Sequence, residues 1–243
     1  MKNIFAVCTK ELYTYFVSPI AYFVCFVFSA LSGFLFSIAL ILTSTSEVSG
    51  LSSVVLQTLF NQMAFILLFF TPVITMKLFA EERKSGTIEL LLTSPVSDSQ
   101  VVLGKYFASM LLLVIMLALT LLYPILILFF GIIDIGLLFS GYLGLILISS
   151  CFISLGLLMS SMSRNQIVAA LSSFGFILIL WILGIISNNP GTISKILSYL
   201  SFHVHYTEFS RGIIVLKDLV FYLSFTCVCL FATVKSIESS KWR

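Results

Sequence analysis

The sequence predicts an all-α, polytopic membrane protein with six transmembrane helices and cytoplasmic N- and C-termini. Its 243 residues are 60% hydrophobic and only 9% charged, with a mean hydropathy of +1.16. Soluble domains have about 25% charged residues, so this chain has too few charges to cover a water-facing surface. Disorder needs the opposite composition, with low hydrophobicity and high charge. We therefore expect residues 1–243 to form a single transmembrane domain in the lipid bilayer.

The six spans follow from length, because a helix needs about 20 apolar residues to cross a hydrocarbon core about 30 Å thick. We expect spans at 20–42, 54–76, 106–130, 136–159, 167–186 and 219–234. Pro72 and Pro124 should kink the second and third of these helices. The pairs Ser140 with Gly144 and Gly156 with Ser160 have a small-x-x-x-small spacing that permits close helix approach.

The distribution of basic residues sets the orientation. With a cytoplasmic N-terminus, ten of the 13 Lys and Arg residues face the cytoplasm and three do not, namely Lys195, Arg211 and Lys217. The two long connections are then 77–105 on the cytoplasmic side and 187–218 on the outer side, and long connections usually carry a function or a structure of their own.

The apolar spans contain no acidic, basic or histidine residue away from their ends. Ion-coupled transporters and channels with charged filters usually keep such groups at mid-depth. This composition therefore disfavours a secondary transporter, a selective ion channel and a membrane-embedded hydrolase. The net charge of +3, without a basic face, gives no reason to expect a nucleic-acid partner.

Uncharged polar residues cluster on one face of the second span, where Gln57, Asn61 and Gln62 stand at i, i+4 and i+5. They could form interhelical hydrogen bonds, or they could line a dimer seam or a substrate path. On the outer side, His203 and His205 with Glu208 offer too few ligands for a specific metal site. Interfacial anchoring and loop hydrogen bonds are the simpler roles for these histidines.

The connection 77–105 has a regular internal pattern. The second membrane helix can continue to about Lys84, where Ser85–Gly86 breaks it. Residues 87–93 can form a short helix with Ile88, Leu91 and Leu92 on one side. Ser94–Pro95 ends that helix, and Ser97 or Asp98 can cap the next one. Its leucine-rich face needs a cover, either lipid headgroups or a groove of a partner protein.

No phosphate-binding loop of the form G-x-x-x-x-G-K-[ST] is present. Around Gly104–Lys105, Ser99 replaces the first glycine and Tyr106 replaces the final Ser or Thr. We therefore expect no cofactor in this chain and no enzyme activity of its own. ATP and Mg would belong to a partner subunit.

Three stretches carry a resemblance to a known family. They are FAEERKSGTIELLLTSPVS at 79–97 with VLGK at 102–105, LSFHVHYTEFSRGIIVLKD at 200–218, and KELYTYFVSPIAY at 10–22. Together they resemble ABC-2-type transporter permease subunits, most closely the gliding-motility (Gld-type) ABC permease group. The two histidines at 203 and 205 depart from the family pattern.

The resemblance implies a type V ABC exporter-like fold in a bacterial cytoplasmic (inner) membrane. Such a subunit pairs with a second permease copy or a homologous permease and with two copies of an ABC ATPase. An extracytoplasmic auxiliary protein is a further candidate partner. Residues 3–18 would form an amphipathic connecting helix on the inner leaflet, where Ile4, Phe5, Cys8, Leu12 and Tyr15 form an apolar stripe. Residues 187–218 would form a re-entrant region on the outer side.

By position, 77–105 is the coupling loop that meets the ATPase. The expected contact residues are Glu81, Glu82, Arg83, Gly86, Thr87, Glu89, Leu91 and Leu92. The implied function is a permease subunit that couples a separate ATPase to the export or extraction of an unidentified substrate. The alternative is a non-transporting membrane anchor that transmits mechanical work from an ATPase in envelope assembly or motility.

Overall fold

A computed structural model describes residues 2–44, 51–87, 96–129, 134–186 and 192–240, and every regular element in them is a helix. The expected all-α fold is therefore confirmed. The elements are α1 (Lys2–Val17), α2 (Pro19–Ser44), α3 (Leu51–Thr75), α4 (Lys77–Ser85), α6 (Asp98–Leu119), α7 (Leu122–Leu128), α8 (Ile135–Met162), α9 (Gln166–Ile186), α10 (Thr192–Leu200), α11 (Phe202–Ser210) and α12 (Leu216–Ser240).

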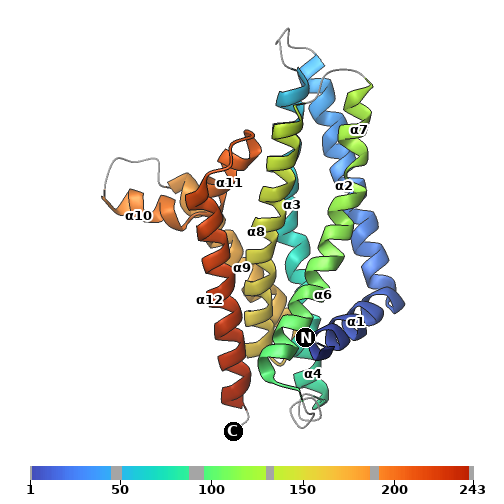
Figure 1. Ribbon diagram of the computed structural model, residues 1–243, viewed down its shortest axis with the longest axis vertical. Coiled ribbons are helices and arrows are strands. Elements are labelled where there is room, and N and C mark those ends of the chain that lie inside the picture. The colour runs from blue at the N-terminus through green and yellow to red at the C-terminus, as the bar shows by residue number, and fades with distance from the viewer. Residues whose placement is uncertain (1, 45–50, 88–95, 130–133, 187–191, 241–243) are drawn as a thin grey trace.

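Six helical stretches are long and apolar enough to cross a membrane. They cover Pro19–Leu42, Ser52–Ser85, Asp98–Leu128, Ile135–Met162, Gln166–Gly184 and Leu216–Ser239. The long helices run side by side, while α1 lies across the end at which α4 and the C-terminal end of α12 also lie (Figure 1). The short helices α10 and α11 lie toward the opposite end of α12. The chain is thus a multi-pass membrane protein.

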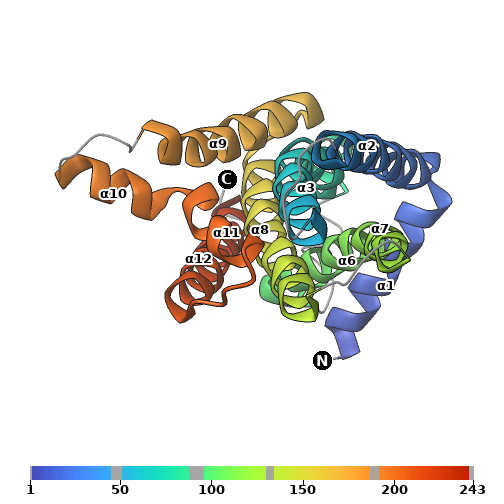
Figure 2. The same ribbon diagram turned by 90° about the horizontal axis from the view of Figure 1, so that it is seen from above.

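The central element is α8, which packs against α3, α4, α6, α9, α11 and α12 (Figure 2). Small residues permit these contacts. A Cβ atom on Gly156 would lie 2.2 Å from the Thr75 hydroxyl of α3, and one on Gly144 would lie 2.6 Å from Phe209 of α11. The close helix approach predicted from the small-residue spacing is therefore confirmed.

The third span is interrupted between α6 and α7, at Thr120 and Leu121. Pro124 explains the position, because a proline has no N–H to donate to the residue four positions earlier and its ring clashes with that carbonyl. Residue 120 is that position, so the kink expected from Pro124 is confirmed. By contrast, α3 continues through Pro72 and ends at Thr75.

Candidate functional site

The C-terminal end of the second span is held by α8. α3 ends at Thr75 and α4 begins at Lys77, so two backbone N–H groups at the start of α4 need acceptors outside the helix. The Ser160 hydroxyl of α8 accepts from the amides of Phe79 and Ala80, both at 3.1 Å, and donates to the Met76 carbonyl at 3.0 Å. One serine therefore fixes the start of α4 against α8.

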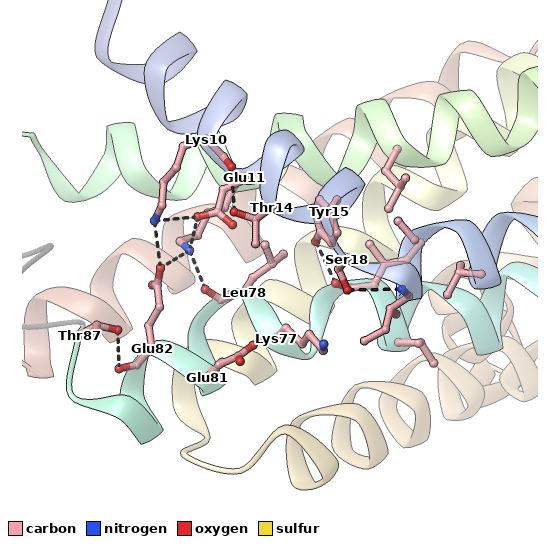
Figure 3. A pocket seen from close by; sticks show the side chains of 17 residues that line it. Lys10, Glu11, Thr14, Tyr15, Ser18, Lys77, Leu78, Glu81, Glu82 and Thr87 are labelled. Carbon is pink, nitrogen blue, oxygen red and sulfur yellow. Dashed lines mark hydrogen bonds and ion pairs between the residues drawn. The ribbon is translucent and has the colours of Figure 1, made fainter.

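The opposite side of α4 is held by a buried cation. Lys105, in the second turn of α6, is only 1% exposed, and its ammonium group lies 3.0 Å from Glu11 Oε1 and 2.8 Å from Glu82 Oε1. It also donates to the Leu78 carbonyl at 2.7 Å. An ammonium group has three N–H bonds, and these three acceptors use all of them. Figure 3 shows that Glu11 of α1 and Glu82 of α4 converge on this point.

Two further contacts stabilise the cluster. Lys10 lies 3.5 Å from Glu11 and 3.9 Å from Glu82, so the two carboxylates share a second, more exposed cation. The Lys105 ammonium also lies 5.0 Å from the centroid of the Phe79 ring. A buried charge is tolerated only when it is paired and hydrogen-bonded, and Lys105 meets both conditions. We call Lys105, Glu11 and Glu82 the junction cluster.

The helix α1 is docked closely enough to bring Glu11 to this point. A Cβ atom on Gly104 would lie 2.7 Å from the side chain of Val7, so only glycine permits this approach of α6. The Tyr15 hydroxyl donates to the Ile74 carbonyl of α3 at 2.9 Å. Burial, and secondarily the charge of Glu11, raise the pKa of Tyr15, so the phenol keeps the proton that it donates.

The inward face of α1 differs from the predicted stripe. Cys8 is buried and Ile4, Leu12 and Tyr15 are half-buried, but Phe5 is 71% exposed and Glu11 is also buried on this face. The reason is that this face packs against α6, where the junction cluster supplies a cation for Glu11. A search of the sequence for apolar residues at helical spacing leaves Glu11 out, because it selects apolar side chains only.

The predicted coupling residues separate into three groups. Glu82 is turned toward Lys105 in the interior, while Glu81, Gly86 and Thr87 are exposed, and Arg83 is half-buried with its Nε unpaired. Gly86 ends α4 in the left-handed region with φ of 72°, and nothing lies within 4 Å of a Cβ placed there. Glu89, Leu91 and Leu92, with the expected helix over 87–93, lie outside the described residues except for Thr87.

The polar face of α3 is separate from this cluster. Asn61 donates to the Gln57 carbonyl at 2.9 Å, which is a bond within the helix. The side-chain oxygens of Asn61 and Gln62 are buried without a hydrogen-bond partner. Whether these residues line a seam or a path stays a prediction.

The two histidines of α11 point into different surroundings, as expected for i, i+2 neighbours on a helix. The His203 ring packs edge-on against Trp181 of α9, with 5.1 Å between ring centroids. His205 lies between Asp218 Oδ1, 2.5 Å from its Nδ1, and the Tyr199 carbonyl, 2.8 Å from its Nε2. Within the described ranges, no three metal-ligating side chains lie together.

The sequence reasoning missed the junction cluster. In the sequence, Lys105 stands out only as the last residue of VLGK, and Glu11 only as the second residue of KELYTYFVSPIAY. A usable signal was present, because Glu11 stands three residues after Cys8 and four before Tyr15, on the face that packs inward. An acidic residue there requires a buried cation nearby.

The fold and the junction cluster define a multi-pass membrane subunit in which α1 is joined to α4 and α6 through Lys105. Residues 42–234 match the family model described as ABC-2 family transporter protein, and the chain belongs to that family. It is therefore a membrane permease component of an ABC transporter. Comparison with curated proteins gave no match.

Proposed function

We propose that this chain is the permease subunit of a Gld-type ABC transporter in a bacterial cytoplasmic membrane. Two permease subunits, identical or homologous, would assemble with two ATPase subunits that bind ATP and Mg. The complex would export or extract a substrate whose chemical class the sequence leaves open. Family membership supports the transporter class, and the lack of a phosphate-binding loop in the sequence supports ATP hydrolysis in the partner.

The observation that carries the coupling role is the junction cluster. We call the coupling loop 77–105, which contains α4 and the start of α6, the cytoplasmic hairpin. Lys105 of α6 is bonded to Glu82 of α4 at 2.8 Å. The same ammonium is bonded to Glu11 of α1. A displacement of the hairpin by an ATPase would therefore move the connecting helix and two membrane helices together.

The exposed end of α4 supplies the test. Gly86 has a positive φ, and a β-branched residue there costs about 1–2 kcal/mol. Because no atom lies within 4 Å of a Cβ at this position, Gly86→Val perturbs the hairpin backbone without disturbing the helix packing. Gly86→Asn is the matched control, since asparagine tolerates the left-handed conformation better.

In a reconstituted complex with its ATPase, Gly86→Val and Glu89→Gln should lower the stimulation of ATP hydrolysis by the permease. Gly86→Asn and Glu238→Gln, an exposed site at the end of α12, should leave more of it intact. Unchanged stimulation in Gly86→Val and Glu89→Gln would refute the coupling role. Affinity purification in mild detergent should also recover an ATPase at about two copies per complex, in line with the symmetry usual for such assemblies.

The Gld-type resemblance also fits a subunit that anchors an ATPase and transmits mechanical work to a partner on the outer side. Substrate flux into vesicles separates the two functions. ATP hydrolysis without any flux, and without stimulation by candidate substrates, would favour the anchor. Transport that persists without an ATPase and follows an ion gradient would refute both.

A further inference from the structure

A cavity of about 540 Å³ lies beside the junction cluster, between α1, the start of α2, the α3–α4 joint and α6 (Figure 3). Its volume falls within the range of about 300–1,000 Å³ that is usual for small-molecule sites. It is located where α2 begins and α3 ends, which is the level at which the membrane helices meet the cytoplasm.

The lining of the cavity has two chemically different ends. One end carries charged and hydroxyl side chains from α1 and α4. The other is apolar and includes Ala21 and Val24 of α2 with Val73 of α3. Ile20 and Val73 are 39% and 37% exposed, so the apolar end reaches the lipid-facing surface. An occupant of this cavity must be polar at one end and apolar at the other.

The polar end offers both signs of charge without an excess of either. Three cations, Lys10, Lys77 and Lys105, face three anions, Glu11, Glu81 and Glu82. Lys105 has no N–H left for a ligand, because Glu11, Glu82 and the Leu78 carbonyl use all three. Lys10 is shared between two carboxylates at 3.5 and 3.9 Å.

The free capacity of the polar end is one cation, Lys77, and one carboxylate, Glu81. The side chains of Lys77 and Glu81 form no ion pair and no hydrogen bond with any residue in the described ranges. The second carboxylate oxygen of Glu82 is buried without a hydrogen-bond partner. That oxygen has almost no accessible surface for a ligand. The cavity therefore suits a ligand that carries a negative group for Lys77 and N–H donors for Glu81.

We propose that this cavity binds a phospholipid of the inner leaflet with a zwitterionic phosphoethanolamine headgroup. The phosphate pairs with Lys77, and the primary ammonium donates to the carboxylate of Glu81. One acyl chain lies along Val24 and Val73 toward the bilayer. An anionic headgroup without an amine matches the balanced lining poorly, and a trimethylated ammonium has no N–H to donate.

Such a lipid would join α4 to α2 and α3 beside the junction cluster. The proposal does not depend on ATPase coupling, because it concerns the permease chain alone. It is tested on the purified, lipid-depleted full-length chain in mild detergent, and native mass spectrometry counts the phospholipids retained. Phosphatidylethanolamine, phosphatidylcholine and phosphatidylglycerol with identical acyl chains are titrated in parallel.

The expected result is one phosphatidylethanolamine retained per chain. Phosphatidylcholine and phosphatidylglycerol should be retained about tenfold more weakly, which is the difference in affinity expected from the loss of one charge-assisted hydrogen bond. Glu81→Gln should abolish the preference for phosphatidylethanolamine over phosphatidylcholine, whereas Lys77→Gln should weaken both equally. Val73→Trp should fill the apolar end and weaken all three. Lys235→Gln and Glu238→Gln alter an exposed pair at the end of α12 and are the matched controls.

Glycerophosphoethanolamine, which has the headgroup without acyl chains, distinguishes a lipid from a soluble phosphate. It should not compete at the same concentration, because it cannot use the apolar end. Competition by it would overturn the lipid proposal. Equal retention of phosphatidylethanolamine and phosphatidylcholine by the wild type would also overturn it, as would retention unchanged in Glu81→Gln, a conservative change at an exposed side chain.

Discussion

Replacement of Lys105 by methionine tests the junction cluster most directly. Methionine keeps the length of the side chain but removes the charge and the three N–H donors. Glu11 is 7% exposed and would keep only Lys10, whose ammonium lies 3.5 Å away and is largely solvated. The variant therefore leaves buried carboxylate oxygens without their main partner.

Breaking a buried ion pair from one side costs about 3–5 kcal/mol. Lys10 remains near both carboxylates, and the Glu82 side chain is 16% exposed, so we expect the low end, about 3 kcal/mol. The free energy of unfolding is measured by reversible denaturation in detergent micelles, followed by tryptophan fluorescence. Lys235→Met is the control, because Lys235 and Glu238 are 57% and 42% exposed and such pairs contribute about 0–1 kcal/mol.

A compensated variant separates the unpaired charge from simple loss of packing. In Lys105→Met combined with Glu11→Gln and Glu82→Gln, no buried carboxylate remains in the cluster. This variant should recover at least half of the lost free energy, about 1.5 kcal/mol, because coupled sites are not additive. The reasoning is refuted if Lys105→Met is no more destabilising than Lys235→Met, or if the three substitutions add their separate costs.

Three further predictions concern packing, capping and protonation. Gly156→Ala should destabilise by about 1–3 kcal/mol, because its Cβ would lie 2.2 Å from Thr75, whereas Gly175→Ala, with nothing within 4 Å, should be neutral or stabilising by up to about 1 kcal/mol. Ser160→Ala should cost about 1–3 kcal/mol in the same denaturation assay, because it leaves two N–H groups of α4 unpaired. Burial lowers the pKa of His203 in the folded chain, so the unfolded chain binds the proton more readily and the free energy of unfolding should fall as the pH drops below about 6.5. In His203→Phe the free energy of unfolding should fall less over the same pH range. The same pH dependence in the variant and the wild type would contradict this prediction.

The sequence was most informative where a single physical rule acts over a long stretch. The helices that cross the membrane follow from apolar length, and the break at Thr120 follows from Pro124 four residues later. The close contacts of α8 follow from Gly144 and Gly156, because glycine is the residue that lets another helix approach. None of these inferences requires knowledge of a distant partner.

The junction cluster depends on residues 94 positions apart in the chain, Glu11 and Lys105. Hydropathy averaged over a span hides one lysine near its end, and a membrane-surface lysine is usually assigned to solvent or headgroups. Only the packing of α1 across α6 shows that this lysine is buried. The same holds for His205 and Asp218, which stand 13 residues apart and meet between α11 and α12.

The position of the cluster limits how the cytoplasmic hairpin can transmit force. Its two stems, α4 and α6, are joined by the Glu82–Lys105 pair, and α4 is joined to α8 by Ser160. Spreading the stems would break the buried Glu82–Lys105 ion pair and the hydrogen bond from Lys105 to the Leu78 carbonyl. Moving them as one unit breaks no bond of the cluster. Under the proposed coupling, an ATPase stroke would therefore tilt α4 and α6 together and carry α1 with them through Glu11.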